Sequence, residues 1–440
     1  MTESKKTDTA RSGPGYVLIL FCIGIVLLMF KSNRILYVRY IQDFFFFLFS
    51  FALMLPYAVT YRKSLERVSM FKGICILLLC AIFFYERGML ADLTSRAIIC
   101  MLITMFGGAM LIMAPLEHKK VVLRVLTISV EAILLIALIG WIPFLLGVDL
   151  PHFRDTSDVY YMHQVYYIFN TFSINSPDDV RRFAGPFLEP GHLGTMCVYL
   201  LYINGCNLKK FGNIILFVST IMSLSLAAYG MLIGAVILIL IEKRKYWAVG
   251  IVSTIVLAIG STAAAFLNGD NVLNKAIVSR LEMTESGDIA GNNRYTTFFE
   301  DTYSKYLNTD KIWLGVGKGA YTSKNKSSGN LMMGNAGYKR YFYLRGIVGT
   351  SLLLIFMALY YSRYHSLKSF GFLLIYVISN LIRDYPAKEI WMYLFLIAIP
   401  ILYFEGRTPK KYKNKKKQTH SLHIDTDARP TSLHGPQLCK

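Results

Sequence analysis

The sequence predicts an all-α polytopic membrane protein with about twelve transmembrane helices and two large loops on the outer face. Three observations predict this class: 54% of the 440 residues are hydrophobic, only 17% are charged, and the apolar residues gather in long runs. A helix needs about 20 apolar residues to cross a bilayer, so several runs are long enough to cross. The predicted crossings are residues 16–30, 43–60, 71–85, 97–115, 123–147, 192–206, 211–226, 228–242, 246–266, 341–361, 369–383 and 389–404.

The apolar run from Phe211 to Ile241 is too long for a single crossing. We predict a break around Leu226-Ala-Ala-Tyr-Gly230, because small residues allow the chain to turn there. This long run therefore supplies two of the predicted helices rather than one.

The distribution of basic residues predicts how the helices are oriented. The formal net charge is +20, which taken alone is compatible with nucleic-acid binding. The lysines and arginines, however, gather at the N-terminus, in alternate loops and in the C-terminal tail, as the positive-inside rule requires of cytoplasmic segments. We therefore expect both termini in the cytoplasm and no nucleic-acid partner. One short loop disagrees, because Lys31, Arg34 and Arg39 face outward in this topology.

Two loops are far longer than a connection between helices needs. We call residues 148–191 the first long loop and residues 267–340 the second long loop; both fall on the outer face. The remaining parts are 1–147 with the first five helices, 192–266 with helices six to nine, 341–404 with the last three helices, and 405–440, a basic cytoplasmic tail predicted to be disordered.

The second long loop contains a helical pattern of its own. Aromatic residues recur along Tyr295–Tyr306 at the helical period, which predicts a helix that packs one face against the membrane domain. A glycine-rich turn, Trp313–Tyr321, follows it. The segment Gly315-Val-Gly-Lys-Gly319 lacks the spacing of a P-loop, so we expect no nucleotide there.

Neither a metal nor another cofactor is predicted. The chain has seven cysteines, but their spacing indicates neither a disulfide framework nor a metal site. The long loops also contain no Asp-x-Asp motif and no cluster of His and Cys.

Arg182 and Glu189 are the first candidates for chemistry. They lie in Arg182-Phe-Ala-Gly-Pro-Phe-Leu-Glu-Pro190, where the first long loop runs into a predicted membrane helix. A guanidinium matches phosphate oxygens in a bidentate manner and stays charged, and a carboxylate can take a proton from an attacking hydroxyl. The alternative is that Arg182 and Glu189 pair with each other and only fix the loop.

Other ionisable and aromatic residues are weaker candidates. Arg345 lies one turn into a predicted helix and could instead extend to the outer interface. His192 could share a site with Glu189 or simply cap the helix, and we expect Arg383-Asp384 to form an interfacial pair. The substrate-binding candidates, for phosphate or glycan, are Arg181, Arg280, Arg345, His192 and Tyr321, and Arg294 joins Arg182 and Glu189 as a catalytic candidate.

The order of these motifs resembles the signature of the bacterial O-antigen polymerase and O-antigen ligase superfamily. The resemblance covers roughly residues 170–355. Its motifs are Arg182-Phe-x-Gly-x-Phe-x-Glu-Pro-x-x-x-Gly194, Ser223-Leu-Ser-Leu-Ala-Ala-Tyr-Gly230, Arg294, Leu314-Gly-Val-Gly-x-Gly-x-Tyr321 and Gly346-Ile-Val-Gly349.

The resemblance implies a membrane-embedded glycosyltransferase fold of the C type in the bacterial inner membrane. Members of this family transfer sugar chains from undecaprenyl pyrophosphate at the outer face. By the resemblance, Arg182 and Arg294 hold the donor pyrophosphate and Glu189 orients or deprotonates the acceptor. The expected partners are an undecaprenyl-pyrophosphate-linked oligosaccharide and membrane lipid; whether a chain-length regulator binds stays open.

The resemblance leaves three functions open. Ligases of the family tend to carry a His shortly before the final Gly-x-x-Gly helix, whereas this chain reads Gly334-Asn-Ala-Gly-Tyr-Lys-Arg340. That departure favours the polymerase over the ligase, which transfers the finished chain to lipid A-core. A polysaccharide transporter or flippase is the alternative of another class, but the large outer loops are hard to explain for a carrier.

Overall fold

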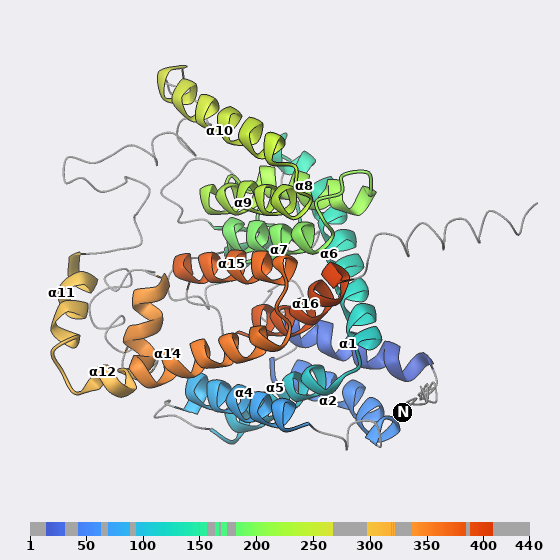
Figure 1. Ribbon diagram of the computed structural model, residues 1–440, viewed down its shortest axis with the longest axis vertical. Coiled ribbons are helices and arrows are strands. Elements are labelled where there is room, and N and C mark those ends of the chain that lie inside the picture. The colour runs from blue at the N-terminus through green and yellow to red at the C-terminus, as the bar shows by residue number, and fades with distance from the viewer. Residues whose placement is uncertain are drawn as a thin grey trace, which may run out of the picture.

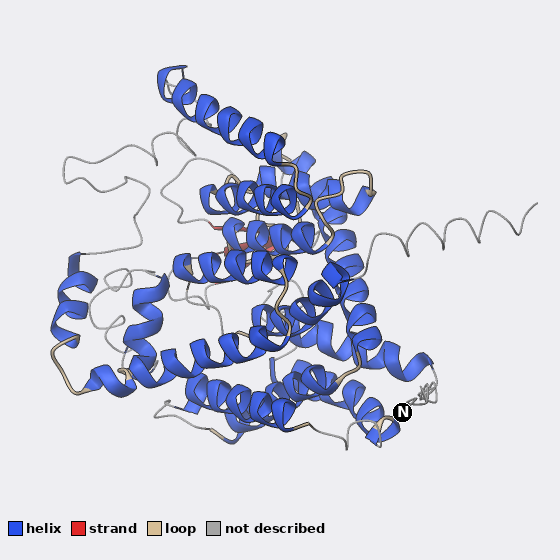
Figure 2. Ribbon diagram, viewed as in Figure 1, coloured by secondary structure: helices blue, strands red, loops and turns tan. Residues whose placement is uncertain are grey.

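The computed structural model is an assembly of helices with one small sheet (Figures 1 and 2). It describes residues 15–30, 43–62, 69–88, 94–148, 150–155, 163–166, 169–173, 182–266, 297–317, 319, 321, 337–383 and 388–407. The helices are α1 (Gly15–Phe30), α2 (Asp43–Thr60), α4 (Met70–Gly88), α5 (Ser95–Met113), α6 (Leu116–Leu145), α7 (Pro190–Ile203), α8 (Phe211–Met222), α9 (Leu226–Glu242), α10 (Tyr246–Phe266), α11 (Thr297–Tyr306), α12 (Lys311–Leu314), α14 (Gly337–Arg363), α15 (Leu367–Ile382) and α16 (Glu389–Arg407).

Each predicted crossing coincides with a helix, which supports a membrane-embedded, multi-pass protein. Four of the described helices are long and apolar enough to cross a bilayer: α5, α6, α14 and α16. Seven further described helices are apolar but shorter. The number of crossings, about twelve, therefore remains a prediction, as does the orientation of the termini.

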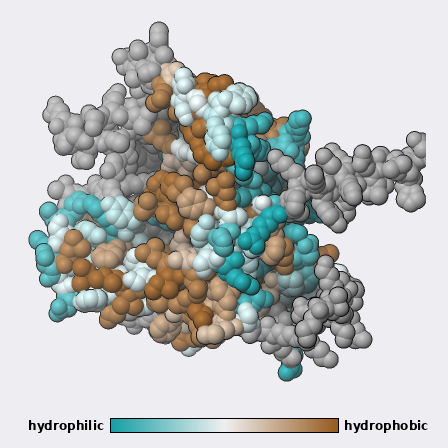
Figure 3. Space-filling view, in the orientation of Figure 1, coloured by the Kyte–Doolittle hydropathy of each residue, from teal (hydrophilic) through white to brown (hydrophobic). Residues whose placement is uncertain are grey.

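The exposed surface of the helices agrees with a membrane environment. Figure 3 shows hydrophobic residues over the middle of the molecule and hydrophilic residues gathered towards its right and left edges. Large exposed apolar side chains include Ile251 and Ile255 on α10 and Leu354 and Ile355 on α14. A soluble monomer rarely exposes an apolar surface of this extent, whereas lipid covers it without cost.

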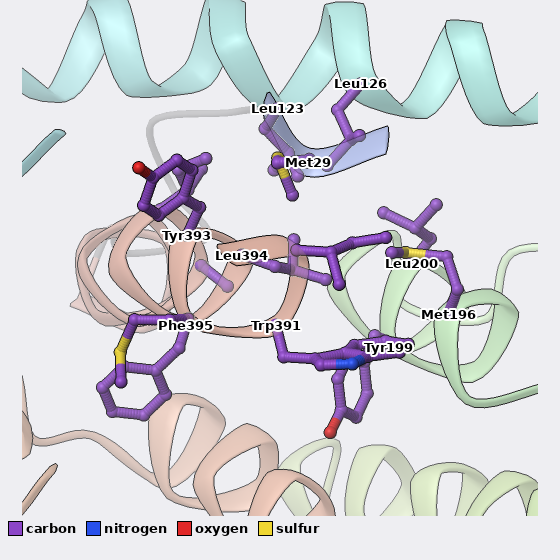
Figure 4. Close-up of a cluster of buried hydrophobic side chains, with 14 of the residues drawn as sticks. Met29, Leu123, Leu126, Met196, Tyr199, Leu200, Trp391, Tyr393, Leu394 and Phe395 are labelled. Atoms are coloured by element: carbon purple, nitrogen blue, oxygen red, sulfur yellow. The ribbon is translucent and has the colours of Figure 1, made fainter. Parts of the chain in front are cut away.

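Helix α16 forms the centre of the core. Every side chain from Ile390 to Ile399 is buried, because α1, α5, α6 and α15 all pack on this helix. In Figure 4, Trp391 and Leu394 of α16 lie against Tyr199 and Leu200 of α7, and Leu123 and Leu126 of α6 approach from the opposite side. This packed centre fixes the relative positions of α7 and α15, which carry the candidate site.

The first long loop contains a sheet that the all-α prediction missed. The strands β1 (His152–Asp155), β2 (His163–Tyr166) and β3 (Asn170–Ser173) form an antiparallel sheet in the order β1-β2-β3. Strand β3 is attached to the helices, since Asn170 Nδ2 donates to the carbonyl oxygen of Ala137 at 2.8 Å. The strands have only four residues each, too short for a periodic signal to stand out in the sequence.

The break between α8 and α9 lies earlier than predicted. Helix α8 ends at Met222 and α9 begins at Leu226, so the turn occupies residues 223–225 rather than 226–230. Leu224 adopts φ +46°, while Ser225 caps α9 by accepting a hydrogen bond from the backbone N–H of Ala228. Serine at the N-cap, not the small residues that follow, therefore sets the boundary.

The described part of the second long loop packs against the first half of α14. Helix α11 falls within the predicted helix, and its Phe299 and Tyr306 are buried beside Tyr343. Lys339 Nζ also lies 2.8 Å from Glu300 Oε2. Figure 1 shows α11 and α12 beside the start of α14, at the left. Helix α14 is kinked at Gly346, which adopts φ +62°.

Candidate functional site

The end of the first long loop is bound to the break between α8 and α9. The backbone N–H of Phe183 donates to the carbonyl oxygen of Met222 at 3.2 Å, and Arg182 Nε donates to the carbonyl oxygen of Ser223 at 3.3 Å. The segment around Arg182 and the turn around Ser223, about 40 residues apart in sequence, thus meet. Their hydrogen bonds pair backbone groups that would otherwise lack a partner. Arg182 is thereby held at the N-terminal side of α7.

Glu189 is held by an arginine from a distant part of the chain. It is the N-cap residue of α7, but its side chain makes no capping hydrogen bond. Instead, Arg383 Nη1 donates to Glu189 Oε2 at 2.5 Å. His192 Nε2 lies 4.0 Å from the same carboxylate oxygen. The expected pair of Arg383 with Asp384 stays a prediction, because Asp384 lies outside the described residues.

Two glycines allow Arg383 to reach this position. A Cβ at Gly191 would overlap the guanidinium of Arg383, so a side chain there would push the guanidinium out of this position. A Cβ at Gly337 would overlap the backbone of Ile382 and Arg383. The first turn of α7, the end of α15 and the start of α14 consequently meet at one place, at the left in Figure 1.

The site combines positive charges with a carboxylate. Burial and the neighbouring charge of Arg383 lower the pKa of Arg182, while Glu189 and Tyr229 act in the opposite sense. An arginine pKa begins so high that the side chain remains protonated at any physiological pH. Arg182 and Arg383 thus outweigh the charge of Glu189, and the cluster favours an anionic ligand.

Gly194 permits close packing beneath the site, and its replacement tests the helix pair that carries it. A Cβ at Gly194 would overlap the Cβ of Ala228 on α9. We expect Gly194→Ala to cost about 1–3 kcal/mol of stability, since neither backbone can yield easily. Thermal unfolding of the purified protein measures this. Gly230→Ala is the matched control, because a Cβ there meets nothing within 4 Å; equal melting temperatures for both variants would contradict the packing.

The candidates Arg345 and Tyr321 contact residues of α14. Arg345 is only 7% exposed, with its guanidinium carbon 4.3 Å from the ring centre of Tyr341, so it is packed inside rather than extended to an interface. Tyr321 is buried, and its ring lies 4.7 Å beneath the guanidinium of Arg340. Arg181, Arg280 and Arg294 lie outside the described residues.

Arg383 is the residue of the site that the sequence analysis did not select. Its only signal was an arginine at the end of an apolar helix, which is usually an interfacial anchor. The pairing with Glu189 spans 194 positions and no sequence periodicity reveals it. Within the described part of the chain, no group of three or more His, Cys, Asp or Glu side chains is arranged to hold a metal ion.

Comparisons of the chain with protein-family models, with curated proteins and with solved structures give no match. The functional argument therefore rests on the motifs and on the geometry of the site.

Proposed function

We propose that this protein is a polysaccharide polymerase of the O-antigen type, a metal-independent glycosyltransferase with a C-type fold in the bacterial inner membrane. It would transfer the growing glycan from undecaprenyl pyrophosphate to the next lipid-linked repeat unit. The observation that supports the proposal best is the cluster of Arg182, Arg383 and Glu189 at the start of α7. This cluster lies where the first long loop enters the apolar helix α7.

The proposed chemistry needs only groups that this cluster provides. The acceptor hydroxyl oxygen attacks the anomeric carbon of the donor sugar and forms the new glycosidic bond. The bond from that carbon to the pyrophosphate oxygen breaks, and the pyrophosphate leaves with the electron pair. Arginines stabilise its developing charge, and Glu189 takes the hydroxyl proton. Arg182 holds the donor in this scheme; Arg294, outside the described residues, keeps the same predicted role.

Two alternatives are less well supported. Against a ligase, the chain lacks the His expected before the last Gly-x-x-Gly helix. In that segment Lys339 contacts Glu300, and Arg340 contacts Tyr321. A transporter needs a polar path through its centre, whereas apolar side chains fill the described core around α16 (Figure 4).

The polysaccharide ladder of cells that lack the protein tests the proposal. We expect core carrying a single repeat unit, with the full ladder restored by the wild-type gene but not by Glu189→Gln. Glutamine keeps the shape of the side chain and removes the base. Loss of all core-attached sugar, with accumulation of lipid-linked polymer, would indicate a ligase. An unchanged ladder would refute both and favour a transporter or a non-catalytic role.

A further inference from the structure

Arg383 differs from Arg182 in what it contacts. Arg182 uses Nε to bind the backbone at Ser223, whereas Arg383 contacts the side chain of the proposed base through Nη1. The side chain of Arg383 is 10% exposed and that of Glu189 is 33% exposed. The side chain of Arg383 is therefore largely enclosed by protein, whereas that of Glu189 is more accessible.

The backbone around Glu189 restrains the main chain but not the carboxylate. Glu189 has extended backbone angles, φ −135° and ψ 144°, and Pro190 follows it as the first helical residue. Its side chain does not cap α7, so the helix itself does not orient it. The guanidinium of Arg383 holds the carboxylate by a short, charge-assisted hydrogen bond.

The packing around Arg383 shows that its position is built into the fold. The guanidinium lies over Gly191, where a Cβ would displace it, and a Cβ at Gly337 would overlap the backbone of Ile382–Arg383. The arrangement directs Arg383 inward, onto Glu189.

We propose that Arg383 is a positioning residue that orients the Glu189 carboxylate towards the acceptor hydroxyl. The inference rests on the proposed function, and it separates the two described arginines: Arg182 serves the donor pyrophosphate, and Arg383 serves the base. His192, with Nε2 at 4.0 Å from the carboxylate, and Arg182, whose pKa Glu189 raises, are also near Glu189. A reacting group that is displaced by about 1 Å loses about 100-fold in rate.

A double-mutant cycle tests this role. The full-length protein is purified, and chain extension is measured with lipid-linked repeat units extracted from cells that lack it. We expect Arg383→Gln to lower kcat about 100-fold while leaving the KM for the lipid-linked unit nearly unchanged, and Arg383→Lys to recover part of kcat. If Arg383 acts through Glu189, the double variant Arg383→Gln/Glu189→Gln is no slower than Glu189→Gln alone.

The opposite results are distinguishable. Additive losses in the double variant, or a raised KM with unchanged kcat, would overturn the positioning role and make Arg383 an independent contact to the substrate. A fall in melting temperature with Arg383→Lys as inactive as Arg383→Gln would make it a structural residue. If the wild-type protein extends no chains under these conditions, the proposed function itself fails, and this inference fails with it.

Discussion

Arg182→Ala is expected to abolish chain extension while the protein remains folded. The guanidinium is the donor-binding cation of the proposed reaction, and removing a group that stabilises developing charge costs at least about 100-fold in rate. The fold should survive because the neighbouring backbone hydrogen bond from Phe183 to Met222 holds the loop on α8 without the side chain. The measurement is the polysaccharide ladder of complemented cells, with expression level and melting temperature determined for the purified variant.

Arg154→Ala is the matched control for this experiment. Arg154 belongs to the same loop but is exposed on β1, so its loss should leave the ladder unchanged. Arg182→Lys adds a second comparison, because lysine keeps the charge but cannot form the bidentate contact with phosphate oxygens. A ladder of normal length from Arg182→Ala would remove Arg182 from the mechanism and with it the main support for the polymerase.

Most of the helical architecture was predictable because it follows from local composition. Each apolar run became a helix near the expected residues, and the helix expected at Tyr295–Tyr306 is present as α11. The sheet in the first long loop was missed because its strands are short and rely on contacts outside themselves, such as that from Asn170 to α6. Local patterns carry no information about such contacts.

The candidate site was predictable only in part, for a related reason. Arg182 and Glu189 could be chosen because they stand in one continuous motif at a loop–helix junction. The partner of Glu189 could not, because Arg383 reaches the site through the packing of α15 on α7. The glycines of the motif gained a physical meaning only in three dimensions: Gly191 lies beneath Arg383 and Gly194 lies against Ala228.

Gly346→Ala is expected to have the largest effect on stability of the substitutions considered. Gly346 adopts φ +62° and ψ −166° at the kink of α14, a conformation found almost only in glycine that costs an L-residue about 1–3 kcal/mol. A Cβ there would also lie 2.5 Å from the carbonyl oxygen of Trp313 and from the backbone nitrogen of Gly315. Because both neighbours are backbone atoms, overpacking adds about 1–3 kcal/mol. We expect a lower melting temperature and faster proteolytic cleavage of the second long loop.

Gly147→Ala measures the cost of a positive φ without overpacking. Gly147 has φ +80°, but a Cβ there would meet nothing within 4 Å, so the substitution should cost only the backbone term of about 1–2 kcal/mol. The difference between the two variants measures how tightly α12 packs against the kink of α14. If Gly346→Ala is no more destabilising than Gly147→Ala, the contact is loose, and α12 does not hold the second long loop on α14. If it is more destabilising and also shortens the polysaccharide ladder, the docked loop contributes to the reaction as well as to the fold.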